Sequence, residues 1–408
     1  MFKMAAKENV FDVRADFPIL ESGVAYLDTA ASAQKPRAVI DAMNSFVETN
    51  YANIHRGLYK FSQESTAAYE AAREKVAGFI GAPSGEEIVF TRNATEGFNL
   101  IAQSWGTTFL KEGDEIILSE MEHHANIVPW QLLRDKIGFT IKVIPVLENG
   151  TLDLEAYKAL LTEKTKLISL VHISNSLGTV NPVQAVIQTA KAFNPDIVTV
   201  IDGSQSAVHG PVNVAELNCD FFVCTGHKLY GPTGVGVLWG RGELLDAMPP
   251  YQGGGDMIEE VTFERTSYKA APARFEAGTP AIIEAIGLGA AIDYLQGIGM
   301  DHVAAHEKNL LDEAMTKLSS FDGLRFYGTA QEKAGIISFT ADWAHTSDIS
   351  MILDQCNVYV RSGHHCCMPL MQRLGIDGTV RASFGLYSNS EDIDALVGGL
   401  EKAKRMLG

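Results

Sequence analysis

Short apolar runs alternate with helical patterns over the first two thirds of the chain. Runs rich in branched residues are typical of buried strands, and apolar residues spaced three or four apart are typical of helices. The alternation predicts a mainly parallel sheet with helices on both faces over residues 22–285. The predicted strands are 87–91, 115–119, 166–172, 197–201, 221–224 and 235–239, and the predicted helices are 36–51, 64–81, 95–105 and 128–137.

The pattern changes near residue 285. A long helical pattern at 281–298 leads out of the sheet region. Beyond it, the predicted helices are 301–319, 346–355 and one from 391, and the predicted strands are 324–327, 336–339, 358–360 and 380–384. We therefore expect a small α+β domain formed by residues 1–21 and 286–408, beside a large domain of residues 22–285.

Composition narrows the class of protein. The chain has 408 residues, 46% of them hydrophobic, and a net charge of -17, which argues against nucleic acid and anionic membranes as partners. We find no apolar run near the roughly 20 residues that span a bilayer, and residues 1–7 lack the apolar centre of a signal peptide. Five cysteines do not form a disulfide framework, so we expect a reducing, cytoplasmic setting.

Two residues at predicted strand ends carry candidate chemistry. Asp202 ends the apolar run 197–201, and Lys228 follows the run 221–224 among small residues that solvate it poorly. Ligands of parallel sheets bind at such ends. A lysine for a Schiff base and a carboxylate against a pyridinium nitrogen are what pyridoxal 5'-phosphate (PLP) requires. From spacing alone, a helix-capping aspartate and a solvated lysine explain the pattern equally well.

Longer motifs carry a resemblance that covers the chain from residue 15 onward. They are YLDTAA at 26–31, NIHRG at 53–57, MEHHAN at 121–126, GHKLYGP at 226–232 and RSGHHC at 361–366. In this order they resemble fold type I (aspartate aminotransferase-like) PLP enzymes of the class V aminotransferase family. Within it, the chain is similar to group II cysteine desulfurases of the SufS/CsdA type. The family's arrangement places the active site between the two domains.

The resemblance implies which residues hold the cofactor. Ala94 and Thr95 are expected at its phosphate, where a helix N-terminus suits an anion, and His123 is expected to stack on its ring and act as acid or base. Simple helix capping and turn chemistry are the alternatives at residues 93–95 and at Asn175. The implied cofactor-binding residues are Ala94, Thr95, His123, Asn175, Asp202, Gln205, Thr225, His227, Lys228 and, toward the neighbouring subunit's phosphate, Thr279.

The resemblance also assigns the substrate and the nucleophile. Arg381 is expected to bind the substrate carboxylate, because two N–H groups of a guanidinium can donate to the two carboxylate oxygens in bidentate geometry. The other implied substrate-binding residues are Asn175, His55 and Arg361. The implied catalytic residues are Lys228, Cys366 and His123. Cys366 would take the substrate sulfur as a persulfide.

Cys367 stands where the family usually has alanine, so which thiol carries the sulfur stays open. Because side chains alternate along an extended loop, we expect Cys367 to point away from Cys366. Zinc is a minor alternative, since adjacent residues cannot easily surround one ion, and we expect no metal. Cys219, Cys224 and Cys356 are interpreted as packed core thiols.

The implied reaction converts L-cysteine to L-alanine and supplies sulfur for iron–sulfur cluster assembly. The implied partners are a second copy of the chain and a sulfur-acceptor protein of the SufE/SufU type, because a short cysteine loop cannot carry the persulfide far. Selenocysteine lyase, acting on L-selenocysteine, is the nearest alternative. An aminotransferase or epimerase, which needs no loop cysteine, and a non-catalytic scaffold are the others.

Overall fold

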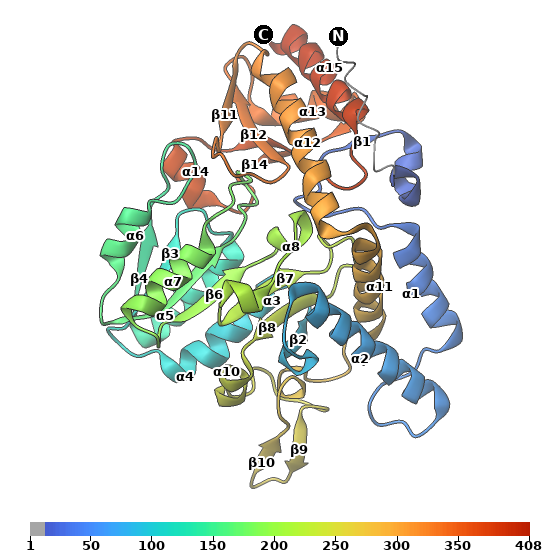
Figure 1. Ribbon diagram of the computed structural model, residues 1–408, viewed down its shortest axis with the longest axis vertical. Helices are drawn as coiled ribbons and strands as arrows, with labels where there is room; N and C mark the ends of the chain where they lie inside the picture. The colour runs from blue at the N-terminus through green and yellow to red at the C-terminus, as the bar shows by residue number, and fades with distance from the viewer. Residues whose placement is uncertain (1–12) are drawn as a thin grey trace, which may run out of the picture.

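A seven-stranded sheet forms the centre of the molecule, whose computed structural model describes residues 13–408 (Figure 1). The strand order is β2-β8-β7-β6-β5-β3-β4, and β8 runs opposite to the other six strands. The strands are β2 (Ile88–Thr91), β3 (Glu115–Ser119), β4 (Thr140–Ile144), β5 (Thr165–Val171), β6 (Val198–Asp202), β7 (Phe221–Thr225) and β8 (Gly236–Gly240).

Both faces of this sheet are covered. In β7, Phe222 and Cys224 pack into one hydrophobic cluster, and Phe221 and Val223 pack into another. Side chains alternate across a strand, so a strand with two buried faces is expected to be mostly apolar. The covering helices are α1 (Arg37–Thr49), α2 (Lys60–Ile80), α3 (Ala94–Ile101), α4 (Thr107–Phe109), α5 (Val128–Ile137), α6 (Leu154–Leu160), α7 (Val183–Phe193), α8 (Ser206–His209), α9 (Val214–Leu217), α10 (Gly242–Ala247) and α11 (Ile282–Ile298).

The C-terminal third forms a second, four-stranded sheet in the order β11-β12-β15-β14, drawn in orange and red in Figure 1. Its elements are α12 (Met300–Ser319), β11 (Leu324–Tyr327), β12 (Ile336–Ala341), α13 (Thr346–Asp354), β14 (Arg361–Gly363), α14 (Met368–Leu374), β15 (Thr379–Ser383) and α15 (Ser390–Leu407). Near it, β1 (Ala25–Tyr26) pairs with β13 (Val358–Tyr359) in parallel. The domain division at residue 285 stays a prediction, and its residues 1–12 lie outside the described part.

The predicted mainly parallel α/β fold is confirmed. The elements β3, α5 and β11 have the predicted bounds. The predicted helix 64–81 begins earlier, at Lys60, and ends where Gly81 takes a left-handed φ of 67°. Sequence patterns missed β4, α6, α7, α14 and the hairpin of β9 (Ile258–Val261) and β10 (Thr266–Tyr268), which projects at the bottom of Figure 1.

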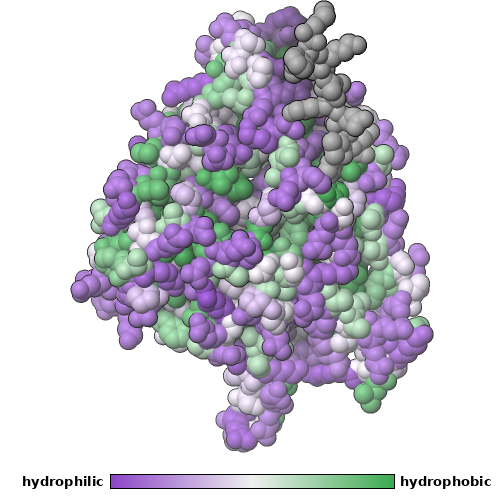
Figure 2. Space-filling view, viewed as in Figure 1, coloured by the Kyte–Doolittle hydropathy of each residue, from purple (hydrophilic) through white to green (hydrophobic). Residues whose placement is uncertain are grey.

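Charged and polar residues cover most of the surface seen in Figure 2, and hydrophobic residues gather only in small groups. Within residues 13–408, no single helix is long and apolar enough to cross a bilayer. Helices α11 and α12 reach that length and composition only as a pair bent by 76°. Leu288 and Leu295 of α11 are buried in the core, which accounts for the apolar composition of this helix.

Candidate active site

A cavity of about 400 Å³ lies where β6 and β7 of the large sheet end, against the loop that follows β14. Twelve of the fourteen predicted site residues line this cavity, which brings together positions from residue 94 to residue 381. They are Ala94, Thr95, His123, Asn175, Asp202, Gln205, Thr225, His227, Lys228, Arg361, Cys366 and Arg381. Thr279 and His55 do not line it.

Lys228 is the only lysine among the residues that line this cavity. It follows β7 in a tight turn, and Asp202 is the last residue of β6. Burial lowers the pKa of Lys228 to about 8, although the Asp202 carboxylate acts in the opposite direction. A lysine with this pKa has a sizeable neutral fraction near neutral pH, and the neutral amine is the form that attacks a carbonyl carbon.

The two adjacent histidines have different positions. His123 lines the cavity, and its Nδ1 accepts a hydrogen bond from the backbone N–H of Ala125 at 3.0 Å. Burial and the nearby Lys228 lower the pKa of His123 to about 4, so the ring is neutral and its proton sits on Nε2. His124 instead contacts the cysteine loop, since its backbone N–H donates to the Cys366 carbonyl at 2.8 Å.

The N-terminus of α3 provides an anion site at one end of the cavity. Ala94 and Thr95 line the cavity there, and the Asn93 side chain caps the helix by accepting from the Glu96 N–H at 3.0 Å. Gly236 of β8 makes this approach possible, because an added Cβ would lie 2.6 Å from the backbone of Asn93. The free N–H groups of a first helical turn favour a negative charge.

Thr225, the last residue of β7, also lines the cavity. Its hydroxyl is buried and has no hydrogen-bond partner within residues 13–408. A buried polar group without a partner is costly, so such a hydroxyl facing a cavity indicates a missing polar ligand. His227 lies nearby, and burial and the charges of Lys228 and Lys35 lower its pKa to about 4.

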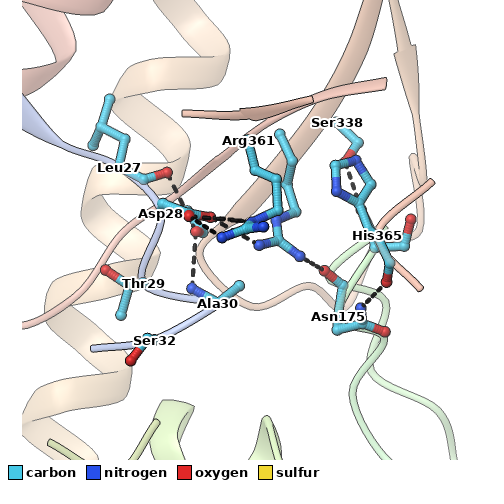
Figure 3. A network of polar contacts seen from close by, with 12 residues as sticks. Leu27, Asp28, Thr29, Ala30, Ser32, Asn175, Ser338, Arg361 and His365 are labelled. Atoms are coloured by element: carbon cyan, nitrogen blue, oxygen red, sulfur yellow. Dashed lines mark hydrogen bonds and ion pairs between the residues drawn. The ribbon is translucent and has the colours of Figure 1, made fainter. Parts of the chain in front are cut away.

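Arg381 is held by an acidic residue that we did not predict as part of the site. Its side chain is 2% exposed; one nitrogen donates to Asp28 at 3.0 Å and another to the Asn175 carbonyl at 2.8 Å. Arg361 also donates to Asp28, at 2.8 Å (Figure 3). Burial lowers the pKa of Arg381, and the Asp28 carboxylate opposes this effect. The buried Nε of Arg381 has no partner in the described chain and remains available to a ligand.

The loop after β14 presents Cys366. We expected residues 361–367 to form a short loop, but residues 361–363 form β14 and only the following residues form the turn. The expectation of an extended loop is wrong, because His365 and Cys366 both have left-handed backbone angles, φ 51° and φ 57°. Two contacts hold this shape: Asn175 donates to the His365 carbonyl at 2.7 Å, and the Cys366 N–H donates to His364 Nδ1 at 3.0 Å.

The two adjacent cysteines nevertheless point in different directions, as predicted. Cys366 is exposed and lines the cavity. Cys367 is fully buried, and burial raises the pKa of its thiol to about 12, so it is protonated. Its S–H donates to the Asn175 side-chain oxygen at 3.1 Å. The exposed thiol is therefore the one that a ligand in the cavity can reach.

The two predicted residues outside the cavity are both exposed. His55 lies before α2 with φ 72°, and its Nε2 is 3.0 Å from a carboxylate oxygen of Glu70. Thr279 precedes α11 and lines a separate hollow with Phe275 and Pro280. Within residues 13–408, no group of three His, Cys, Asp or Glu side chains is placed to share a metal ion.

Comparisons with known proteins agree with this geometry. The family model described as aminotransferase class-V matches residues 25–396. A cysteine desulfurase of Pectobacterium atrosepticum is 48% identical over 402 residues, which cover 97% of this chain and 98% of the relative.

Two solved structures have the same architecture. The cysteine desulfurase CsdA of Escherichia coli, in its S-sulfonic acid form, has a TM-score of 0.91 and 38% identity, covering 97% of this chain and 98% of CsdA. The apo cysteine desulfurase of Thermococcus onnurineus has a TM-score of 0.93 and 39% identity over 100% of both chains. The chain therefore belongs to the class-V aminotransferase family, among the cysteine desulfurases.

Proposed function

We propose that this protein is a PLP-dependent cysteine desulfurase. It converts L-cysteine to L-alanine and keeps the removed sulfur as a persulfide on Cys366. The observation that carries the proposal is one cavity lined by Lys228, Asp202 and Cys366. An aminotransferase or epimerase has no use for the exposed thiol, whereas a desulfurase requires it at this place.

The residues fit the cofactor. Thr225 offers a buried hydroxyl without a partner, beside the capped N-terminus of α3, where a phosphate group is stabilised. Lys228 supplies the amine for the Schiff base, and Asp202 supplies the carboxylate that keeps a pyridinium nitrogen protonated. When bound, PLP supplies an electron sink that stabilises negative charge at the substrate's α-carbon.

Side chains of this chain carry out the remaining catalytic steps. Lys228 would be the base that takes the substrate's α-proton, because its lowered pKa suits proton transfer near neutral pH. His123 presents its Nε2–H to the cavity from a ring fixed through Nδ1. The Cys366 sulfur attacks the substrate sulfur, so an S–S bond forms, the C–S bond breaks, and the substrate's β-carbon is reduced to the methyl group of alanine.

Replacement of Arg381 by alanine is expected to raise the KM for L-cysteine. The substitution removes a buried bidentate partner of the substrate carboxylate, which costs about 2–4 kcal/mol, or roughly 30- to 1000-fold. Initial rates over a range of cysteine concentrations measure the effect, and the visible absorption of bound PLP checks that the cofactor site survives. An unchanged KM would place the carboxylate site elsewhere.

The reaction of the cofactor-free protein with PLP should follow the titration of Lys228. Only the neutral amine attacks the aldehyde, and burial lowers the Lys228 pKa to about 8. The rate of incorporation should therefore rise with pH with a midpoint near 8, well below the value of about 10.4 for an ordinary lysine. Stopped-flow absorbance at a series of pH values measures this midpoint. A rate still rising steeply above pH 10 would contradict the prediction.

A homodimer would explain the positions of His55 and Thr279. Both are exposed outside the cavity of their own chain, where a second copy of the chain can reach them. Three large side chains before and within α2 are also exposed, Leu58, Tyr59 and Phe61, and such a group is typical of an interface. The dimer, its SufE/SufU-type acceptor and the SUF role in iron–sulfur cluster assembly are proposals that rest on the resemblance. The cytoplasmic setting is a proposal that rests on the five free cysteines.

The test is a direct assay of the purified protein with PLP. L-cysteine should yield equimolar alanine and persulfide sulfur, and the alternative substrate L-selenocysteine should be compared at matched concentrations. No alanine from either substrate, with PLP bound, would overturn the proposed function. A much higher kcat/KM for selenocysteine would identify a selenocysteine lyase instead.

A further inference from the structure

A chain of buried polar groups leads from the cavity to helix α12. Gln205, which lines the cavity, lies with its side-chain oxygen 3.0 Å from Nε2 of His209 in α8. His209 Nδ1 in turn lies 2.5 Å from a carboxylate oxygen of Glu307 in α12. His209 is 5% exposed and Glu307 is 2% exposed. The three residues therefore form one solvent-excluded chain that connects the two parts of the molecule.

Hydrogen-bond donors and acceptors fix the direction of this chain. The other end of the Gln205 amide meets the Ala30 carbonyl at 2.8 Å, and a carbonyl can only accept, so the amide nitrogen must lie there. The Gln205 oxygen consequently faces His209, whose Nε2 must carry a proton. This holds whether the proton between His209 and Glu307 sits on nitrogen or on oxygen.

The orientation of a glutamine amide decides what it offers to a ligand. A rotation by 180° replaces two N–H donors with an acceptor that repels an anionic oxygen. One N–H of Gln205 is used by Ala30, and the second is left for the cavity. A buried charged pair contributes little net stability compared with apolar residues of similar size. Packing alone therefore gives no reason for His209 and Glu307 to occupy this position.

We propose that His209 and Glu307 are positioning residues that hold Gln205 with an N–H toward the phenolic oxygen of the cofactor. The proposal rests on the proposed function, because it takes PLP as the ligand of the cavity. Gln205, which the resemblance implies as a partner of this oxygen, would touch the cofactor, and the other two residues act only through it. An N–H at this oxygen stabilises the form of the lysine-bound cofactor that has lost its imine proton, so it lowers the pKa of that group.

The test is a pH titration of the visible absorption of the PLP-loaded protein. His209→Leu removes the Nε2–H, and the midpoint should rise by about one pH unit, the effect of one lost hydrogen bond. His209→Gln places an amide N–H near the former Nε2 and should restore most of the shift. Glu307→Gln should raise the midpoint in the same direction, because it weakens the fixation of His209.

Two controls separate positioning from general destabilisation. Asp392→Asn changes another buried carboxylate, which pairs with Arg14 at 2.9 Å away from the cavity, and should leave the midpoint unchanged. In a Gln205→Leu background, His209→Leu should add no further shift, since its only route to the cofactor is gone.

The outcomes distinguish the two proposals. If the wild-type chain forms no visible Schiff-base band with PLP, the proposed function fails. If it does, and His209→Leu titrates like the wild type, or shifts the midpoint equally in the Gln205→Leu background, the positioning role is overturned.

Discussion

Replacing Lys228 with alanine is expected to abolish both the visible absorption of bound PLP and the turnover of L-cysteine. No other lysine lines the cavity, so no second amine can form the Schiff base or take the α-proton there. Loss of a positioned base alone costs roughly 10²- to 10⁴-fold, and loss of the covalent linkage adds to this. Absorbance spectra and alanine formation measure the two effects separately.

Lys333 offers a matched control for this variant. It is partly buried and its pKa is also lowered to about 8, but its ammonium donates to the Leu177 carbonyl at 2.7 Å, outside the cavity. Lys333→Met should keep the visible band and the turnover. A Lys228→Ala protein that still converts cysteine would remove the basis of the PLP assignment.

Replacing Cys366 with serine is expected to abolish sulfur transfer while PLP stays bound. A hydroxyl is a far weaker nucleophile toward sulfur than a thiolate, so we expect a fall of at least roughly 10³-fold. Cys367→Ala changes a buried, protonated thiol that does not line the cavity, and activity should change by less than about threefold. Mass spectrometry after limited turnover should locate the extra sulfur on Cys366.

Sulfur found mainly on Cys367 would change the assignment of the nucleophile. A persulfide found chiefly on Cys367, together with an active Cys366→Ser protein, would show that the buried thiol is reached through a movement of the loop. Release of selenium by Cys366→Ala, with no release of sulfur, would support the selenocysteine lyase alternative, because selenide leaves more readily.

The hydrophobic pattern predicted the sheet because β7 is apolar at its first four positions, Phe221 to Cys224, as burial on both faces requires. It missed the hairpin of β9 and β10, whose β10 residues are all exposed and follow no apolar period. The strand β4 was missed for a related reason, since it is an edge strand with only Ile144 fully buried. The hydrophobic pattern of a sequence shows which residues are buried, so it does not predict elements that lie outside the core and bury few residues.

The candidate site was predicted mainly from sequence motifs, because the spacing of polar residues alone did not identify it. Spacing placed Asp202 and Lys228 at strand ends, but it could not identify Asp28, whose two partners lie 333 and 353 positions away. Likewise, Glu307 lies 98 positions from His209. Such contacts arise only when the C-terminal part of the chain packs against the N-terminal segment and against α8, and nothing local in the sequence encodes them.

The left-handed backbone of His365 and Cys366 has a consequence for anyone who wishes to move this loop to another protein. Residues with a Cβ resist that conformation, at a cost of roughly 1–2 kcal/mol each. Two groups that hold it, the Asn175 side chain and the backbone N–H of His124, lie far away in the sequence, in the segments that follow β5 and β3. A graft of residues 361–367 alone should therefore relax to an ordinary turn. The Cys366 thiol would then point in another direction, unless Asn175 and His124 were transferred together with the loop.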